Sequence, residues 1–298
     1  MRLAIVILFG IGGTLGYSTA ARAALVGFEA QVLSDNPFLY YRLGESSGTT
    51  AIDASGNLRN GTHVGGPSFG APGYQGGDTA ISYDGSNDRT LTGGFGSWGS
   101  QLDNHSVEMI FSGLTPKSSI ERLLGVYRTG GSSSAYQLSA NVQGNSAGST
   151  ALFYREGSGG GRHAVIFDES EVNIYDGGYH HLVFTFDQSL PAADRMSVYA
   201  NGVKLTSSLT VTASNTTPGN ELDFDFEMAI AARNLRGSID SFAEVTFDEL
   251  VLYDKTLTAS DVSRHFNAAF IPEPSSLLTY SAFGILGLGM AGRRARRS

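Results

Sequence analysis

Short runs in which apolar and polar residues alternate recur along most of the chain, and Gly, Asn, Asp and Ser separate them. Alternation with a period of two is typical of strands that bury one face. Helical periodicity is rare between these runs, so the body of the chain is predicted to be all-β, a two-sheet antiparallel sandwich. The predicted strands are residues 38–43, 79–83, 106–111, 122–127, 135–141, 151–155, 163–167, 180–187, 196–200, 203–209, 224–231 and 246–254.

Two local motifs predict a hairpin and a helix. Asn201-Gly202 separates two predicted strands, and this dipeptide is typical of a two-residue type I′ turn. Near the end of the body, Thr258 and Asp261 have the spacing of a capping box. We expect one short helix there, which stops before residue 272 and covers one end of the sandwich with an apolar stripe. The stripe consists of Val262 and Phe266.

The first 23 residues form a separate segment. They carry Arg2 and Arg22 without any acidic residue, and an apolar stretch follows Arg2. The small residues Ala21 and Ala23 then stand at the two positions that a signal peptidase recognises. Residues 1–23 are therefore predicted to be a cleaved signal peptide. A membrane anchor is the alternative, although the apolar stretch is short for a spanning helix.

The last 27 residues, 272–298, form a second special segment. A Pro-Glu-Pro triplet (Pro272, Glu273, Pro274) precedes an apolar run at 276–292, which predicts a short hydrophobic helix. A basic cluster that would stay in the cytoplasm follows the run; it consists of Arg293, Arg294, Arg296 and Arg297. The tail resembles the PEP-CTERM sorting signal of Gram-negative bacteria. That resemblance implies membrane contact through the tail and processing by an exosortase; a plain membrane anchor is the alternative.

Charge is unevenly spread over the chain. Six of the 20 basic residues and one of the 28 acidic residues lie in the two end segments, so residues 24–271 keep 14 basic and 27 acidic residues. The net charge of this single predicted domain is therefore −13 rather than the −8 of the whole chain. Such a domain repels phosphate backbones, which argues against a nucleic-acid partner. The absence of Cys excludes disulfides, thiolate metal sites and cysteine nucleophiles.

One predicted strand has an acidic face. Strict alternation over residues 221–228 places four carboxylates on one side of the strand and apolar side chains on the other. Paired carboxylates are the usual acid–base groups of glycoside hydrolases. A solvent-facing acidic strand, a cation site and a hydrolytic site are the three interpretations, of which we adopt the first. The four acids are Glu221, Asp223, Asp225 and Glu227.

Three aspartates in turn-like segments are candidate calcium ligands. Asp53 begins a segment with oxygen-bearing side chains at alternate positions, and Asp84 and Asp88 frame a Gly-Ser-Asn turn. Calcium prefers oxygen ligands, although such turns also form without a metal. His180 and His181 are adjacent in a predicted strand and point to opposite faces, so they cannot bind one metal ion together.

Several segments, taken in order, resemble the concanavalin A-like, laminin-G-like family of jelly rolls. The resemblance implies that the first and last strands pair and that one calcium ion often lies on loops at the rim. It also implies sugar rings that stack on aromatic side chains. Trp98, the single Trp, and Tyr179, which stands where the family has Trp, are the candidate ligand-binding residues. The similar segments are residues 35–45, 51–62, 81–88, 179–187, 198–202 and 247–258.

Together these features predict an exported bacterial protein of the cell envelope, cell surface or extracellular matrix. Its jelly roll is expected to be a non-catalytic module that binds a polysaccharide or glycoconjugate, or acts as an adhesive, and calcium is its candidate cofactor. Exosortase-type sorting machinery is the second expected partner. The alternatives are a glycoside hydrolase that uses the acidic strand 221–227 and a purely structural matrix protein.

Overall fold

The computed structural model describes residues 27–93, 104–117, 119–127, 137–143, 150–156, 162–168, 171–206, 210–213, 227–235 and 237–271. The predicted signal peptide and sorting tail, Trp98, and the acidic residues Glu221, Asp223 and Asp225 lie outside the described residues. Residues Phe28–Ile271 form one compact unit. Neither helix in the described part of the chain is long and apolar enough to span a membrane.

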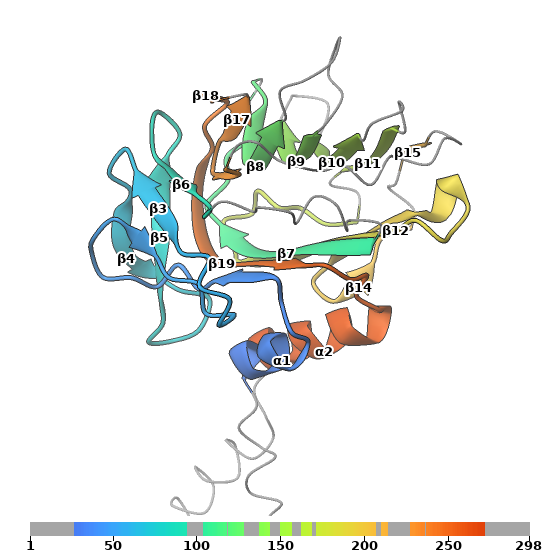
Figure 1. Ribbon diagram of the computed structural model, residues 1–298, viewed down its shortest axis with the longest axis horizontal. Helices are drawn as coiled ribbons and strands as arrows, with labels where there is room; N and C mark the ends of the chain where they lie inside the picture. Colours follow the sequence, from blue (N-terminus) through green and yellow to red (C-terminus); the bar gives the residue numbers. More distant parts are fainter. Residues whose placement is uncertain are drawn as a thin grey trace, which may run out of the picture. The chain divides into compact units, whose positions relative to one another are not determined.

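Two β-sheets lie face to face (Figure 1). Sheet A has the strand order β14-β13-β12-β7-β19-β5-β4. The last strand, β19, pairs with β5 through its first half and with β1 through its second half. The strands of sheet A are β1 (Leu39–Tyr41), β4 (Ser68–Pro72), β5 (Thr79–Asp84), β7 (Asn104–Ser112), β12 (His180–Asp187), β13 (Met196–Ala200), β14 (Val203–Lys204) and β19 (Glu244–Tyr253).

Sheet B has the strand order β15-β11-β10-β9-β8-β16-β6-β3-β2, and the hairpin β17–β18 joins it at β8. Described strand pairs are antiparallel except for β17 with β8. The strands of sheet B are β2 (Thr50–Ala51), β3 (Gly61–Val64), β6 (Arg89–Leu91), β8 (Glu121–Tyr127), β9 (Gln137–Gln143), β10 (Thr150–Glu156), β11 (Arg162–Asp168), β15 (Thr210–Ala213), β16 (Ala229–Ile230), β17 (Arg233–Leu235) and β18 (Ser238–Asp240).

The main core lies between the two sheets. Alternate residues of β7 and β12 point into it, and Phe111 and Phe184 are among its largest fully buried side chains. The residues between them are also buried, because the opposite face of sheet A carries a second apolar cluster. Strands with both faces covered read as nearly continuous apolar runs rather than as a strict alternation. This explains why His180–Asp187 is buried along almost its whole length.

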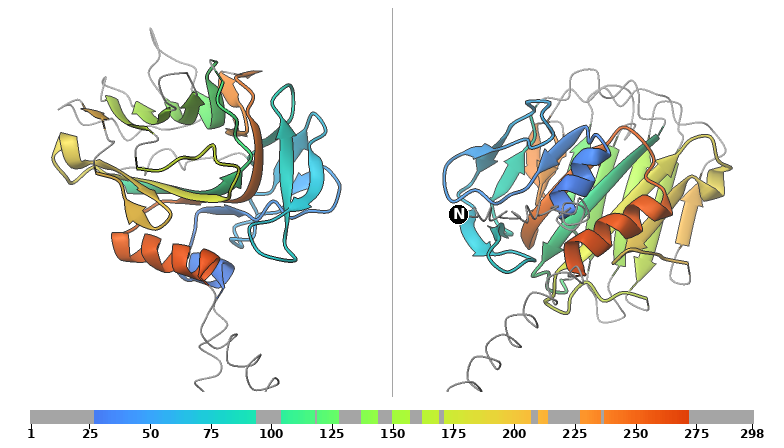
Figure 2. Two further views of the ribbon diagram at one scale, coloured as in Figure 1. Left: turned by 180° about the vertical axis from the view of Figure 1, so that it is seen from behind. Right: turned by 90° about the horizontal axis from the view of Figure 1, so that it is seen from below.

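Two helices cover the outer face of sheet A (Figure 2). These two helices are α1 (Phe28–Ser34) and α2 (Ala259–Phe270), and α2 follows β19. A short 3-10 helix, η3 (Ala192–Asp194), lies between them in the chain. α2 begins with the predicted capping box, in which the Thr258 side chain accepts from the Asp261 N–H and the Asp261 side chain accepts from the Thr258 N–H. The expected position of α2 at one end of the sandwich is wrong. Val262 packs with Val183 and Val251 across the face of the sheet, because these strands are apolar on their outer side as well.

The predicted sandwich of two antiparallel sheets is confirmed, as is the pairing of first and last strands. The strands at 180–187 and 196–200 have the predicted bounds. Of the described residues in two other predicted strands, 203–206 and 227–231, only Val203–Lys204 and Ala229–Ile230 are strand. α1 was not predicted from the sequence. Its seven residues are too few for a clear helical period, and packing of Phe28 and Val32 against sheet A stabilises it.

Candidate functional site

A β-bulge in β19 brings two acidic side chains to the outer face of sheet A. Phe247 pairs with Phe111 and Glu249 pairs with Ile110, so Asp248 is an extra residue on the β19 side. A bulge of this kind shifts the alternation of side chains by one position. Phe247 and Leu250 therefore both point into the main core, and the two acids between them, Asp248 and Glu249, lie on the other side.

Asp78, in the turn between β4 and β5, joins these two acids. One carboxylate oxygen each of Asp78, Asp248 and Glu249 lies within 4.8 Å of the others, and we call this group the carboxyl cluster. Asp248 Oδ2 accepts a hydrogen bond of 2.5 Å from the Tyr74 N–H. Arg42 lies at the edge, with Nη2 3.5 Å from Asp78 Oδ2 and Nε 3.9 Å from Glu249 Oε1.

The carboxyl cluster is electrostatically costly. Burial raises the pKa of Asp248 to about 7, although the hydrogen bond from the Tyr74 N–H acts to lower this pKa. Burial and then the neighbouring Asp248 charge raise the pKa of Glu249 well above its ordinary value. Burial and the Glu249 charge likewise raise the pKa of Tyr40. The fold therefore holds two adjacent carboxyl groups in a place where both resist ionisation unless a positive charge compensates them.

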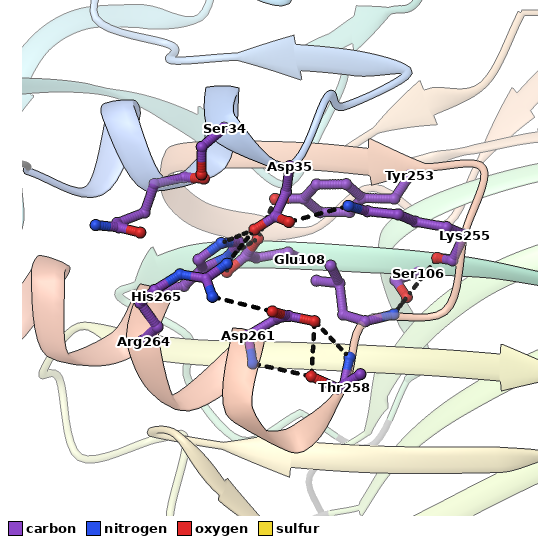
Figure 3. Close-up of polar contacts among 12 residues, drawn as sticks. Ser34, Asp35, Ser106, Glu108, Tyr253, Lys255, Thr258, Asp261, Arg264 and His265 are labelled. Carbon is purple, nitrogen blue, oxygen red and sulfur yellow. Dashed lines mark hydrogen bonds and ion pairs between the residues drawn. The ribbon is translucent and has the colours of Figure 1, made fainter.

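A second polar group lies buried on the same face of sheet A (Figure 3). Glu108 on β7 has no solvent exposure, and three side chains from other elements surround its carboxylate. His181 Nε2 lies 2.6 Å from Oε1, the Tyr253 hydroxyl donates to Oε2 at 2.7 Å, and His265 Nδ1 lies 3.0 Å from both oxygens. We call these four residues the Glu108 network.

The Glu108 network continues to the surface through α1 and α2. His265 Nε2 lies 2.9 Å from Asp35 Oδ2, and Lys255 Nζ lies 3.0 Å from Asp35 Oδ1. Arg264 also contacts Asp35 (Figure 3). Although burial opposes ionisation, the charge of His265 and the hydrogen bonds from His181 and His265 lower the pKa of Glu108. Burial lowers the pKa of His265. The negative charge of Glu108 makes the largest contribution in the opposite direction, and the pKa of His265 is raised overall. These side chains tie both helices to the sheet.

An open polar cavity of about 290 Å³ lies where α1 leads into β1. Arg59 stacks on the ring of Phe38, with 3.8 Å between its guanidinium carbon and the ring centroid. The Asn57 amide donates to the carbonyls of Pro37 and Phe38 at 3.1 and 3.0 Å. We call this the Arg59 cavity. Its lining residues are Leu33, Asn36, Pro37, Phe38, Ser55, Asn57, Arg59 and Asp254.

The three aspartates that the sequence singles out for calcium lie in two separate turns. Asp53 is buried, and its carboxylate accepts hydrogen bonds from the N–H groups of Tyr40, Ser55 and Arg59. Asp84 is exposed and accepts from the Ser86 N–H at 2.8 Å. Asp88 is buried, and burial followed by the Asp84 charge raises its pKa. Backbone N–H groups thus occupy the carboxylate of Asp53. These hydrogen bonds hold in place the segment that lines the Arg59 cavity.

The other predicted site residues are dispersed. The Tyr179 hydroxyl donates to the Pro72 carbonyl at 2.5 Å, and its ring contacts Tyr74. Glu227, the described member of the predicted acidic strand, is exposed and lies outside the one group of three or more acidic side chains found among the described residues. His180 and His181 point to opposite faces, as predicted, toward Phe111 and Glu108 respectively.

Sequence reasoning missed the carboxyl cluster and the Glu108 network. One signal of the bulge was present: apolar residues occupy positions 245 and 247, then 250 and 252, so the alternation changes phase at the two acids. The partners of Glu108 could not be found in this way. They lie 73 to 157 residues away along the chain and meet only through the strand order and the position of α2.

The profile of a laminin-G-type family, described as the concanavalin A-like lectin/glucanases superfamily, matches residues 114–263, half of the chain. None of the curated proteins matches the chain significantly.

Among solved structures, the binding domain of paraclostridial mosquitocidal protein 1 is similar, with a TM-score of 0.57 and 14% identity over 80% of this chain and 53% of that chain. The receptor-binding domain of botulinum neurotoxin type G has a TM-score of 0.52 and 13% identity over 78% and 51%. The binding domain of botulinum neurotoxin DC, solved in complex with SialylT, has a TM-score of 0.55 and 12% identity over 80% and 52%. The chain thus spans about half of each of these structures, and the similarity concerns the fold. On the matched profile and the two-sheet architecture, the chain belongs to the concanavalin A-like lectin/glucanases superfamily.

Proposed function

We propose that the domain is a non-catalytic carbohydrate-binding module and that a saccharide binds in the Arg59 cavity. The observation that carries this proposal is the combination of an aromatic–guanidinium stack with short polar side chains around one open cavity. Sugar rings present apolar C–H faces and a periphery of hydroxyl groups. Such a ligand is matched by an apolar contact surface with a few well-placed donors and acceptors.

The polar groups of the cavity supply both hydrogen-bond donors and hydrogen-bond acceptors. Arg59 has five N–H donors and uses one described hydrogen bond, from Nη1 to the Phe38 carbonyl. Asn57 uses its amide group on the backbone, so its side-chain carbonyl oxygen is available as an acceptor. Asp254 is exposed and adds a carboxylate, which accepts strong hydrogen bonds from hydroxyl groups.

The cavity is also pre-organised, which reduces the entropy lost when a ligand binds. Asp53 accepts hydrogen bonds from the N–H groups of Ser55 and Arg59 and so fixes the segment between them. The same carboxylate accepts from the Tyr40 N–H and thereby ties this segment to β1. Similar solved structures that are named as binding or receptor-binding domains support binding as the role of the fold.

The test begins with a glycan-array screen of the full chain, followed by affinity electrophoresis in gels that contain the selected polysaccharide. Asp254→Ala removes an exposed cavity side chain, and we expect it to weaken retention by about tenfold or more, since hydrogen bonds to charged groups contribute about 1.5–3 kcal/mol. Lys204→Ala, on β14, is the control and should bind like the unchanged protein. A chain that retains no glycan, or an Asp254→Ala variant that binds normally, would overturn the proposal.

The same preparation tests the non-catalytic part of the proposal. The selected polysaccharide is incubated with the protein, and newly formed reducing ends are measured. We expect none. Reducing ends that form with the unchanged chain but not with Glu227→Gln would support the glycoside hydrolase instead.

We propose further that the module acts outside the cell, at the envelope or in the matrix, after export and exosortase-type processing. Support comes from the sequence of the two end segments, 1–23 and 272–298. Cell fractionation with mass spectrometry of the mature chain tests this proposal. A chain that stays in the cytoplasm with residues 1–23 still attached would contradict it.

A further inference from the structure

The Arg59 cavity carries a positive charge that selects among saccharides. We infer, on the basis of the proposed carbohydrate-binding function, that its ligand is a sugar acid, a saccharide whose ring carries a carboxylate. The Arg59 guanidinium binds this carboxylate, and the other polar groups of the cavity bind the ring hydroxyls.

Arg59 is a cation without a counter-ion within the described residues. Its guanidinium makes one hydrogen bond to them, from Nη1 to the Phe38 carbonyl at 3.2 Å, and it takes part in none of their ion pairs. Arg42, Arg233 and Arg264, in contrast, each pair with an acidic side chain. Residues 24–271 contain 27 acidic and 14 basic residues, yet none of the described acids compensates Arg59. An anion from solution is therefore the partner that this charge favours.

The guanidinium of Arg59 is held in the geometry that a carboxylate requires. Its central carbon lies 3.8 Å from the centroid of the Phe38 ring, and Phe38 is itself buried. Stacking uses the flat face of the guanidinium and leaves the N–H groups at its edge for a ligand. Two such parallel N–H groups match the two oxygens of a carboxylate. Because the stack and the hydrogen bond already restrict the side chain, less entropy is lost on binding.

The backbone around the cavity is strained in a way that places Arg59 there. Asn36, which lines the cavity, has a φ of 51°, and Leu58 has a φ of 59° between the lining residues Asn57 and Arg59. A leucine rarely adopts this left-handed conformation, and the Leu58 side chain is 83% exposed, so its packing does not compensate the strain. The hydrogen bond from the Arg59 N–H to Asp53 Oδ2, at 2.9 Å, helps to hold it. Strain of this kind is concentrated at ligand sites.

The remaining polar groups suit a ligand with a single negative charge. The Asn36 side-chain amide has no hydrogen-bond partner among the described residues, and Ser55, whose oxygen accepts from the Asn57 N–H, keeps its own O–H as a donor. Asp254 is exposed, so solvent and salt screen its repulsion of a carboxylate. A densely sulfated polymer would bring many negative charges to one cation in an acidic domain. The balance of charge therefore favours a carboxylated sugar over a sulfated one.

Affinity electrophoresis of the full chain tests this inference with four acidic polymers: polygalacturonate, alginate, hyaluronan and polysialate. Each polymer is compared with its carboxyl-reduced form, which is neutral and keeps the same linkages. Dextran and dextran sulfate are the neutral and sulfated controls. We expect at least one acidic polymer to retain the protein about 10- to 100-fold more tightly than its reduced form, as hydrogen bonds to a charged group allow. This retention should weaken as NaCl is added.

Variants assign the charge selectivity to Arg59. Arg59→Gln should lower the affinity for the retained acidic polymer by about 10- to 100-fold and leave the affinity for its reduced form unchanged. Arg59→Lys keeps the charge without the planar N–H pair, so its affinity should be intermediate. Arg195→Gln is the matched control, because Arg195 also donates to a backbone carbonyl, that of Leu190, but does not line the cavity. Circular dichroism verifies the fold of each variant.

The outcomes separate this inference from the function on which it rests. Equal retention by acidic and reduced polymers, or an Arg59→Gln variant that binds the acidic polymer normally, would overturn the sugar acid and leave saccharide binding intact. Retention by dextran sulfate but by no carboxylated polymer would also overturn it. If none of the acidic polymers is retained, the inference fails, and the glycan array decides separately whether neutral saccharides bind.

Discussion

Glu108 shows how a single side chain can join elements that are far apart in the sequence. Its carboxylate is fully buried, and groups from β12, β19 and α2 compensate it through His181, Tyr253 and His265. Replacing a whole buried ion pair by apolar residues is often neutral, whereas removing one partner leaves the others uncompensated. The network therefore specifies where α2 docks more than it adds net stability.

Substitution of this residue should be costly. Glu108→Gln keeps the shape of the side chain and removes the charge that His265 faces, so we expect the free energy of unfolding to fall by about 3–5 kcal/mol. Urea denaturation measures the loss. Glu244→Gln, at an exposed pair with Lys117, should change the same quantity by less than about 1 kcal/mol. Equal effects of the two substitutions would show that Glu108 has no special role.

At the scale of secondary-structure elements, local sequence patterns predicted the features that depend on residues close together in the chain. The Asn201-Gly202 turn has positive φ at both residues, 49° and 79°, as a type I′ turn requires. The capping box of α2 and the bounds of β12 and β13 were also predicted. The bulge in β19 was not, because an extra residue in a strand is defined by the register with its neighbour β7.

Gly202 also has a tertiary role, since a Cβ atom there would lie 2.8 Å from the ring of Phe266 on α2. Gly177 has nearly the same φ, 80°, but open space around it. Gly177→Ala should cost about 1–2 kcal/mol of unfolding free energy for the backbone alone. Gly202→Ala should cost about 1–3 kcal/mol more, because α2 must shift. Thermal or urea unfolding of the two variants measures this difference, and equal losses would contradict the contact.

At the scale of the whole molecule, the candidate sites were the least predictable feature. Asp78 and Asp248 are 170 residues apart in numbering, and nothing in either local sequence identifies the other as its neighbour. The alternation of apolar and polar residues predicted the sandwich, and turn-like segments made Asp53 a calcium candidate; in the structure, three backbone N–H groups donate to its carboxylate. Strand order, which brings these residues together, depends on contacts across the entire chain.

The Glu108 network should give the molecule a characteristic pH dependence. The pKa of His265 is raised, so its stabilising charge is fully present below its ordinary value of about 6.5 and is lost as the pH rises through the raised value. The pKa of Glu108 is lowered, so its contribution is present above about 4.5 and is lost on acidification. The contribution of the network is therefore largest between about pH 4.5 and 6.5.

His265→Gln tests this window. We expect the difference in unfolding free energy between the unchanged chain and the variant to shrink as the pH rises from about 6 to 9, because the unchanged chain then loses its imidazolium. Urea denaturation at a series of pH values measures the difference. A difference that stays constant over this range would exclude titration of His265 as its source.

The pairing of β1 with β19 has a consequence for how the chain folds. Leu39 pairs with Leu252, and Lys255 contacts Asp35 at 3.0 Å, so the first strand of sheet A finds its partner only after more than 200 residues. Such non-local pairing makes folding slow, since the entropy of closing a long loop must be lost before any contact compensates it. During synthesis, Leu39–Tyr41 has no partner strand until β19 has been made. The nascent chain therefore completes sheet A only once β19 has been made, and a chain that stops before Glu244 lacks the strand that pairs with Leu39–Tyr41.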